Sequence, residues 1–147
     1  MISLNKQQLN FTHRCVIIGS FRKHYDQIVN VIEDFNAAEI EVLSPKKAKI
    51  LNPTDEFVIF DYDPEGLSEK ELEDLVLKKM HGSDFVYLVN PEGYIGRSAA
   101  FEMGYCAARG FKIFAMEDST ELCMKYTHGV KSPKEVIQYL KRAKEYA

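Results

Sequence analysis

Residues 83–116 read SDFVYLVNPEGYIGRSAAFEMGYCAARGFKIFAM. Segment 85–89 is apolar at every position, and segment 112–116 is almost as apolar, as expected for strands that are buried on both faces. Between them, a glycine-containing turn leads into residues 97–109, whose small and apolar side chains favour a short helix. A strand, a helix and a second strand in this order are typical of a parallel sheet.

The rest of the chain continues this alternation of strands and helices. The apolar run 13–19 predicts a first strand, and residues 25–35 have the 3.6-residue spacing of a helix that packs by one face. The other expected elements are a strand at 39–43, a loop at 46–54, a short extra strand or hairpin at 57–62, a helix at 68–80 that starts with a capping box, and a final helix from 132. We therefore expect one domain over residues 1–147. Its fold class is α/β: a flavodoxin-like, doubly wound sheet, mostly parallel, with about five strands and helices on both faces.

Composition and charge limit the possible partners. The net charge of −3 and the pI near 5.8 argue against a binder of nucleic acid polymers. The apolar runs are far shorter than the roughly 20 residues of a membrane span, and residues 1–8 lack the layout of a secretory signal. The cysteines form no close pair and the histidines are scattered, so we expect reduced thiols, no metal site and no cofactor. These features predict a cytoplasmic protein without a membrane partner.

The loop after the first strand is a candidate anion site. In a doubly wound sheet, ligands bind beyond the carboxyl ends of the strands, where the connections reverse direction. The N–H groups and the dipole of the following helix favour an anion there, and an arginine can bind phosphate in a bidentate manner. An ordinary turn with solvated cations is also compatible with this segment. The candidate binding residues are Gly19, Ser20, Phe21 and Arg22.

The loop after the central strand is the second candidate. It starts at Asn90, Gly96 permits close approach of a ligand to the backbone, and Ser98 offers a hydroxyl donor near the start of a helix. The alternative is a flexible connection in which Ser98 caps the helix. We expect this loop and the first one to lie side by side and to form the rim of one pocket.

Two carboxylates complete the set of candidates. Glu102 lies about one turn into the expected helix 97–109, where Ser98 and Cys106 offer it no basic partner. A buried carboxylate costs several kcal/mol unless another group compensates it, although an exposed glutamate fits the same pattern. Asp84 stands at the start of the central strand, where a cap or turn residue is the alternative.

Together these segments resemble the nucleoside 2-deoxyribosyltransferase-like superfamily, which includes deoxynucleoside 5′-monophosphate N-glycosidases. The most specific part is GRSAAFEMGYCA at 96–107, and VIIGSFR at 16–22 and SDFVYL at 83–88 add to it. The resemblance extends from about residue 14 to residue 116 and is weakest over 46–63.

The resemblance implies roles for the candidate residues. Glu102 is the expected nucleophile, which attacks C1′ of a nucleoside, expels the base and forms a glycosyl ester that water or a second base resolves with retention. Asp84 is expected to protonate or orient the base. Ser20, Arg22 and Ser98 are expected to hold a 5′-phosphate. The resemblance also implies a homo-oligomer, a dimer or larger.

We therefore expect a retaining enzyme, either a nucleoside deoxyribosyltransferase or a nucleotide N-glycosidase, which acts on a small nucleoside or its 5′-monophosphate. The alternatives are a non-catalytic nucleotide-binding or sensing module on the same scaffold and a small domain that serves only in assembly. Convergence of Glu102 and Asp84 on one cavity would favour catalysis, whereas an exposed Glu102 far from Asp84 would favour binding.

Overall fold

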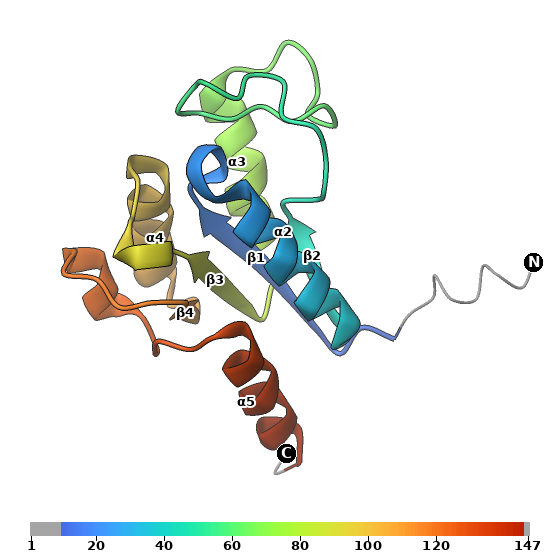
Figure 1. The fold of residues 1–147 in the computed structure, drawn as a ribbon, viewed down its shortest axis with the longest axis vertical. Helices are drawn as coiled ribbons and strands as arrows, with labels where there is room; N and C mark the ends of the chain where they lie inside the picture. The colour runs from blue at the N-terminus through green and yellow to red at the C-terminus, as the bar shows by residue number, and fades with distance from the viewer. Residues whose placement is uncertain (1–9, 146–147) are drawn as a thin grey trace, which may run out of the picture.

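The structure is a computed structural model, and it describes residues 10–145; residues 1–8, considered above as a possible signal, lie outside this part. Four parallel strands form one sheet in the order β2-β1-β3-β4 (Figure 1). The strands are β1 (His13–Gly19), β2 (Ile40–Ser44), β3 (Phe85–Val89) and β4 (Ile113–Ala115). This is the strand order of a flavodoxin-like fold, as expected.

Helices cover both faces of the sheet, which confirms the doubly wound arrangement. They are α2 (Phe21–Ala37), α3 (Glu69–Met80), α4 (Arg97–Arg109) and α5 (Pro133–Glu145), with short 3-10 turns at η1 (Pro91–Gly93) and η2 (Leu122–Tyr126). One core cluster joins α2 and α5 to the sheet, and the other joins α3, α4 and η2 to the opposite face. No helix between residues 10 and 145 is both long enough and apolar enough to cross a bilayer.

The start of α3 is confirmed, and helix α2 is longer than expected. Ser68 and Glu71 form the predicted capping box of α3. Helix α2 begins at Phe21 rather than at residue 25, because the hydroxyl of Ser20 accepts a hydrogen bond from the N–H of Lys23 and caps the helix earlier.

The sheet has four strands rather than about five. Val130 makes only a single parallel bridge to Ala115, beyond the edge of β4, where a fifth strand would lie. Residues 57–62 form no strand, and Phe60 makes one antiparallel bridge, to Ile50. The amide of Asn52 accounts for this, since it accepts from the N–H of Ile59 at 2.6 Å and donates to the carbonyl of Phe57 at 2.8 Å, in place of a neighbouring strand.

Strands β1 and β3 meet closely at their carboxyl ends. Gly19 pairs with Val89, so the two loops that follow these strands are neighbours, as the sequence predicts. The φ angle of Gly19 is 154°, and a Cβ at this position would lie 2.6 Å from the carbonyl oxygen of Val89. Only glycine fits this backbone conformation and this close approach.

Asn90 fastens the end of β3 to the chain beyond β4. Its side chain is 0% exposed. The amide donates to the carbonyl of Glu117 at 2.8 Å and accepts from the N–H of Glu117 at 2.9 Å. The side-chain amide of Asn90 therefore makes the same pair of hydrogen bonds with the backbone of Glu117 that a residue of a neighbouring strand would make.

We expect Asn90→Ala to lower the free energy of unfolding by about 2 kcal/mol, because it removes two hydrogen bonds made by a fully buried side chain and leaves the N–H and carbonyl of Glu117 without these partners. Urea unfolding measures the change. Asn30→Ala is the matched control, since Asn30 is exposed on α2 and its loss should cost less than about 0.5 kcal/mol. Equal effects of the two substitutions would contradict the role given to Asn90.

Candidate active site

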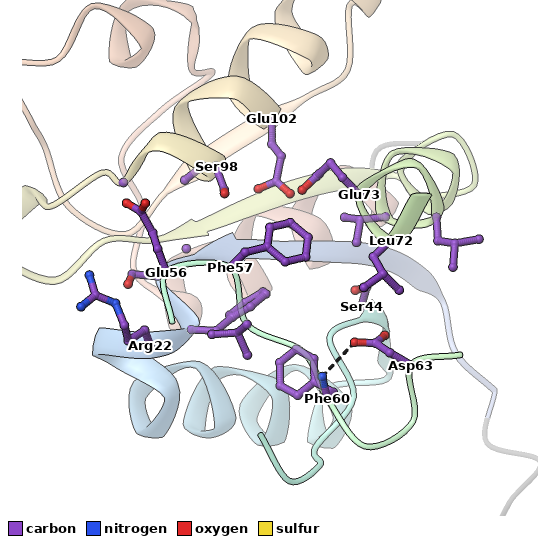
Figure 2. Close-up of a pocket in the computed structure, with 18 of the residues that line it drawn as sticks. Arg22, Ser44, Glu56, Phe57, Phe60, Asp63, Leu72, Glu73, Ser98 and Glu102 are labelled. Atoms are coloured by element: carbon purple, nitrogen blue, oxygen red, sulfur yellow. Dashed lines mark hydrogen bonds between the residues drawn. The ribbon is translucent and has the colours of Figure 1, made fainter. Parts of the chain in front are cut away.

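A pocket of about 310 Å³ opens at the carboxyl ends of β1 and β2, beside the loop that follows β3. Its walls are the start of α2, the start of α4, one side of α3 and part of the connection between β2 and α3, residues 45–68, which we term the β2–α3 connection (Figure 2). This is the topological switch point of the sheet, where the connection after β1 leads toward β2 and the connection after β3 leads in the opposite direction, toward β4. The volume is at the lower end of the range for small-molecule sites.

All four residues predicted in the first loop line the pocket: Gly19, Ser20, Phe21 and Arg22. The Ser20 oxygen accepts the capping bond of α2, which leaves its hydroxyl hydrogen available to a ligand. The guanidinium of Arg22 is exposed at the rim, and the ring of Phe21 packs against Phe60 with centroids 5.5 Å apart. This loop therefore contributes donors on one side and an apolar surface on the other.

The second loop contributes the start of α4. Gly96 is the N-cap residue and makes no side-chain capping bond, and the first turn of α4 contains no acidic residue. Ser98, which is not the cap, lines the pocket with Gly96. The first N–H groups of a helix lack partners within it, so this end of the pocket suits an anion. Asn90 is not among the lining residues, because its amide is held by Glu117.

Glu102 is buried, with 7% of its surface exposed, and its carboxyl group lines the pocket. Figure 2 shows it facing the carboxyl group of Glu73, which comes from α3. Burial, then a hydrogen bond with Glu73, and then the charge of Glu73, together raise the pKa of Glu102 well above the usual 4.5. Glu102, which the sequence analysis selected because it has no basic partner in its helix, thus has a second carboxyl group as its neighbour.

Glu73 is the residue that the sequence analysis missed. Its Oε2 atom is buried and has no hydrogen-bond partner among the described residues. A weak signal was present in the sequence, since Glu73 directly follows Leu72 and precedes Val76 by three positions, both part of the apolar stripe of α3. An acidic residue at the edge of a buried stripe faces its neighbours rather than solvent.

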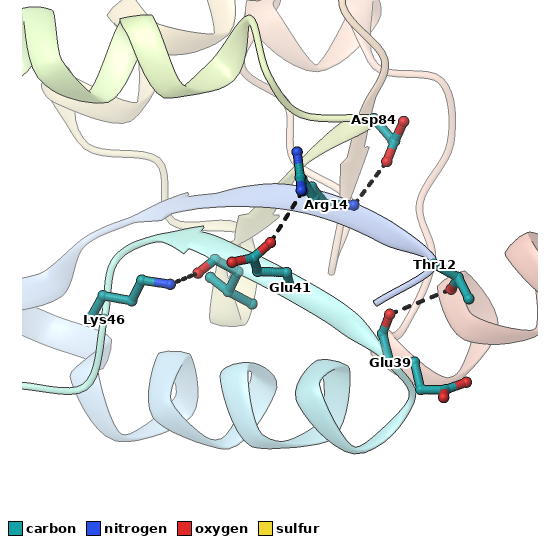
Figure 3. Close-up of polar contacts among 7 residues, drawn as sticks. Thr12, Arg14, Glu39, Glu41, Lys46 and Asp84 are labelled. Carbon is teal, nitrogen blue, oxygen red and sulfur yellow. Dashed lines mark hydrogen bonds and ion pairs between the residues drawn. The ribbon is translucent and has the colours of Figure 1, made fainter. Parts of the chain in front are cut away.

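Asp84 does not converge with Glu102, and that expectation is wrong. It lies at the amino end of β3, where its carboxylate accepts from the N–H of Arg14 at 2.8 Å and its own N–H donates to the carbonyl of Arg14 at 2.7 Å (Figure 3). The residues that line the pocket do not include it. The reason is topological. In a parallel sheet all amino ends of the strands lie on one side and all carboxyl ends on the other, and ligands bind beyond the carboxyl ends. Asp84 is therefore a structural residue that joins the start of β3 to β1, and it does not cap the preceding helix.

The β2–α3 connection provides much of the apolar wall. Asn52 holds Phe57 in place through the carbonyl bond described above, and the hydroxyl of Tyr25 bonds to the carbonyl of Ala48 at 2.6 Å and accepts from its N–H at 2.9 Å. The β2–α3 connection is thus stabilised by hydrogen bonds within it and by hydrogen bonds to Tyr25 of α2. The apolar side chains at this end of the pocket are Phe57, Val58, Phe60, Leu72, Leu75 and Val76.

The pocket is therefore polarised. Arg22, Ser20, Ser98 and the start of α4 form a polar end, and the β2–α3 connection and α3 form an apolar end, with the Glu102–Glu73 pair also on the wall. Two carboxyl groups that share one proton supply both an acid and a base or nucleophile. Within residues 10–145, no group of three or more His, Cys, Asp or Glu side chains is placed to hold a metal ion.

Comparison with known proteins finds similarity in structure. No protein-family model and no curated protein matches the chain. The structure of the CMP N-glycosidase BcmB of Clostridium botulinum aligns with a TM-score of 0.55 at 14% identity, over 88% of this chain and 98% of that one. A conserved protein from Enterococcus faecalis V583 aligns with a TM-score of 0.58 at 13% identity, over 89% of this chain and 98% of that one. At this level of identity the similarity shows a shared fold, and the expected flavodoxin-like α/β fold is confirmed.

Proposed function

We propose that the protein cleaves the N-glycosidic bond of a nucleoside or its 5′-monophosphate, with Glu102 as the nucleophile. The observation that carries the proposal is the burial of Glu102 against Glu73 in a pocket with hydroxyl and guanidinium donors at one end and mostly apolar side chains at the other. The similar fold of a CMP N-glycosidase supports the same reaction class.

The two ends of the pocket orient the substrate. Arg22, Ser20 and Ser98 receive the 5′ end of the sugar, and the apolar wall that includes Phe57 and Val76 receives the base. The sugar then lies between these ends, beside the carboxyl pair. Stacking and apolar contact are suited to a planar base, and hydroxyl and guanidinium donors are suited to the oxygens of the sugar or phosphate.

In the first step, the ionised Glu102 carboxylate attacks C1′ as the bond from C1′ to the base nitrogen breaks. The pair holds one proton, which Glu102 passes to Glu73 and Glu73 passes on to the departing base, so the base leaves neutral. A bond from C1′ to a Glu102 oxygen replaces the glycosidic bond. Positive charge that develops on the sugar ring is stabilised by the carboxylate during this exchange.

In the second step, water or an acceptor base attacks C1′ and releases Glu102. Glu73, now ionised, takes the proton of the attacking group, which restores the starting state of the pair. Two displacements at the same carbon retain its configuration. Hydrolysis and transfer differ only in the acceptor.

A nucleotide-binding module that lacks turnover is the second candidate. The observation in its favour is the position of Asp84, which the family resemblance assigns to the reaction and which lies at the opposite edge of the sheet. Such a module would be stabilised thermally by nucleotides such as CMP and would release no base from them. Free-base chromatography on the same samples separates the two functions.

Oligomerisation and a cytoplasmic location stay predictions. Phe101 on α4 and Leu122 and Tyr126 on η2 are exposed apolar side chains, which are suited to contact with another subunit.

We expect Glu102→Gln to reduce base release by at least about 10³-fold, because an amide is a poor nucleophile and forms no stable ester. The assay follows free base by chromatography with a panel of ribo- and deoxyribonucleosides and their 5′-monophosphates, each with and without an acceptor base. Glu69→Gln, an exposed substitution on α3, is the control and should keep full activity. Full activity of Glu102→Gln, with its fold intact by circular dichroism, would end the assignment.

We expect Glu73→Gln to lower kcat by about 10²- to 10⁴-fold, since the departing base loses its proton donor. The substitution also removes the negative charge that helps to raise the pKa of Glu102. The acidic limb of kcat/KM should therefore move to lower pH. A lower rate with an unmoved acidic limb would show that Glu73 does not act on Glu102.

We expect the stability advantage of Glu102→Gln over the wild type to grow with pH. The raised pKa means that the folded wild type binds this proton more tightly than the unfolded chain does, so its stability falls as the pH rises from about 4.5 through the folded pKa. Glutamine does not titrate, so the free energy of unfolding of the variant does not fall with pH for this reason. Urea unfolding at several pH values measures the gap, and a gap that does not change with pH would contradict the burial of an uncompensated acid.

A further inference from the structure

We propose that Glu56 determines specificity at the 5′ end of the substrate, where it disfavours a 5′-phosphate relative to a 5′-hydroxyl group. The inference deepens the proposed function and rests on the orientation of the substrate given there. Nothing in the sequence singles out Glu56, which belongs to the segment with the weakest family resemblance.

Glu56 lies at the polar end of the pocket. Its carboxylate is 3.9 Å from the Nη1 atom of Arg97, at the start of α4, and the Glu56 side chain is 57% exposed. It is one of the lining residues, and Figure 2 shows it at the same end of the pocket as Arg22 and Ser98. A negative charge from the protein thus occupies the region that is otherwise suited to a phosphate.

The position of Glu56 is set by its neighbours in the chain. Phe57, the next residue, is held through its carbonyl by the amide of Asn52, and the N–H of Asp55, the preceding residue, donates to the carbonyl of Asn52 at 3.0 Å. These bonds fix the backbone on both sides of Glu56. Its carboxylate therefore stays near the mouth of the pocket, even though a partly exposed ion pair with Arg97 contributes little energy by itself.

The charges at this end discriminate between a phosphate and a hydroxyl group. A phosphate dianion gains from Arg22 and Arg97, but it is repelled by Glu56 and competes with Glu56 for Arg97. A neutral 5′-hydroxyl group meets no such repulsion, and it can donate a hydrogen bond to the carboxylate. Replacing Glu56 by glutamine removes the repulsion and frees Arg97, while the amide still offers an oxygen acceptor.

The test compares binding of ribose 5-phosphate and ribose to the wild type, Glu56→Gln and Glu65→Gln by NMR titration. Glu65 is an exposed glutamate on the same connection that does not line the pocket, which makes it the matched control. We expect Glu56→Gln to tighten the binding of ribose 5-phosphate roughly tenfold at low salt, with a smaller gain at about 0.5 M salt, because exposed charges are screened. Ribose binding should change less than about twofold, and Glu65→Gln should resemble the wild type.

An unchanged or weaker affinity of Glu56→Gln for ribose 5-phosphate would overturn the inference, as would an equal gain in Glu65→Gln. Absence of ribose 5-phosphate binding to all three proteins would also overturn it, because the polar end would then not receive a phosphate. The readout is binding, so it is independent of turnover. A tenfold gain without base release from any substrate would refute the proposed reaction and leave the role of Glu56 intact.

Discussion

The carboxyl group of Glu102 is packed between α4 and α3 against the carboxyl group of Glu73, and this contact, together with burial, raises the pKa of Glu102. Removing a carboxylate from water is unfavourable, and a second carboxylate beside it adds repulsion. Both effects disfavour the ionised form of Glu102, so its pKa is raised. A proton held at the wall of an open pocket is available for transfer to a ligand.

The sheet brings this pair to a site where a ligand can reach it. Gly19 lets β1 and β3 approach closely at their carboxyl ends, and Asn90 secures the segment beyond β4 to the end of β3. The starts of α2 and α4 then lie beside one another at the same edge of the sheet. The β2–α3 connection completes the pocket from a different part of the chain, with Phe57 on the apolar side and Glu56 at the polar end.

Local signals predicted most of the secondary structure. Segment 85–89 is apolar because both of its faces are covered, and the capping box at Ser68 marks the start of α3. The β2–α3 connection was not predictable in the same way, because its shape depends on side-chain bonds from Asn52 to backbone groups several residues away. The extra strand expected at 57–62 is reduced to the bridge between Phe60 and Ile50, and no feature of the sequence distinguishes a single bridge from a strand.

The sequence by itself determined the parallel doubly wound fold, and it singled out the loops after β1 and β3 and Glu102 as candidates, because each depends on neighbouring residues and their spacing. Only the tertiary structure decided which carboxyl group faces Glu102. Asp84 and Glu73 both precede α4 in the chain. Asp84 lies at the amino end of β3, which is the end away from the pocket, whereas Glu73 lies on the side of α3 that faces α4. That choice follows from the packing of two helices across one face of the sheet, a long-range contact that local spacing does not encode.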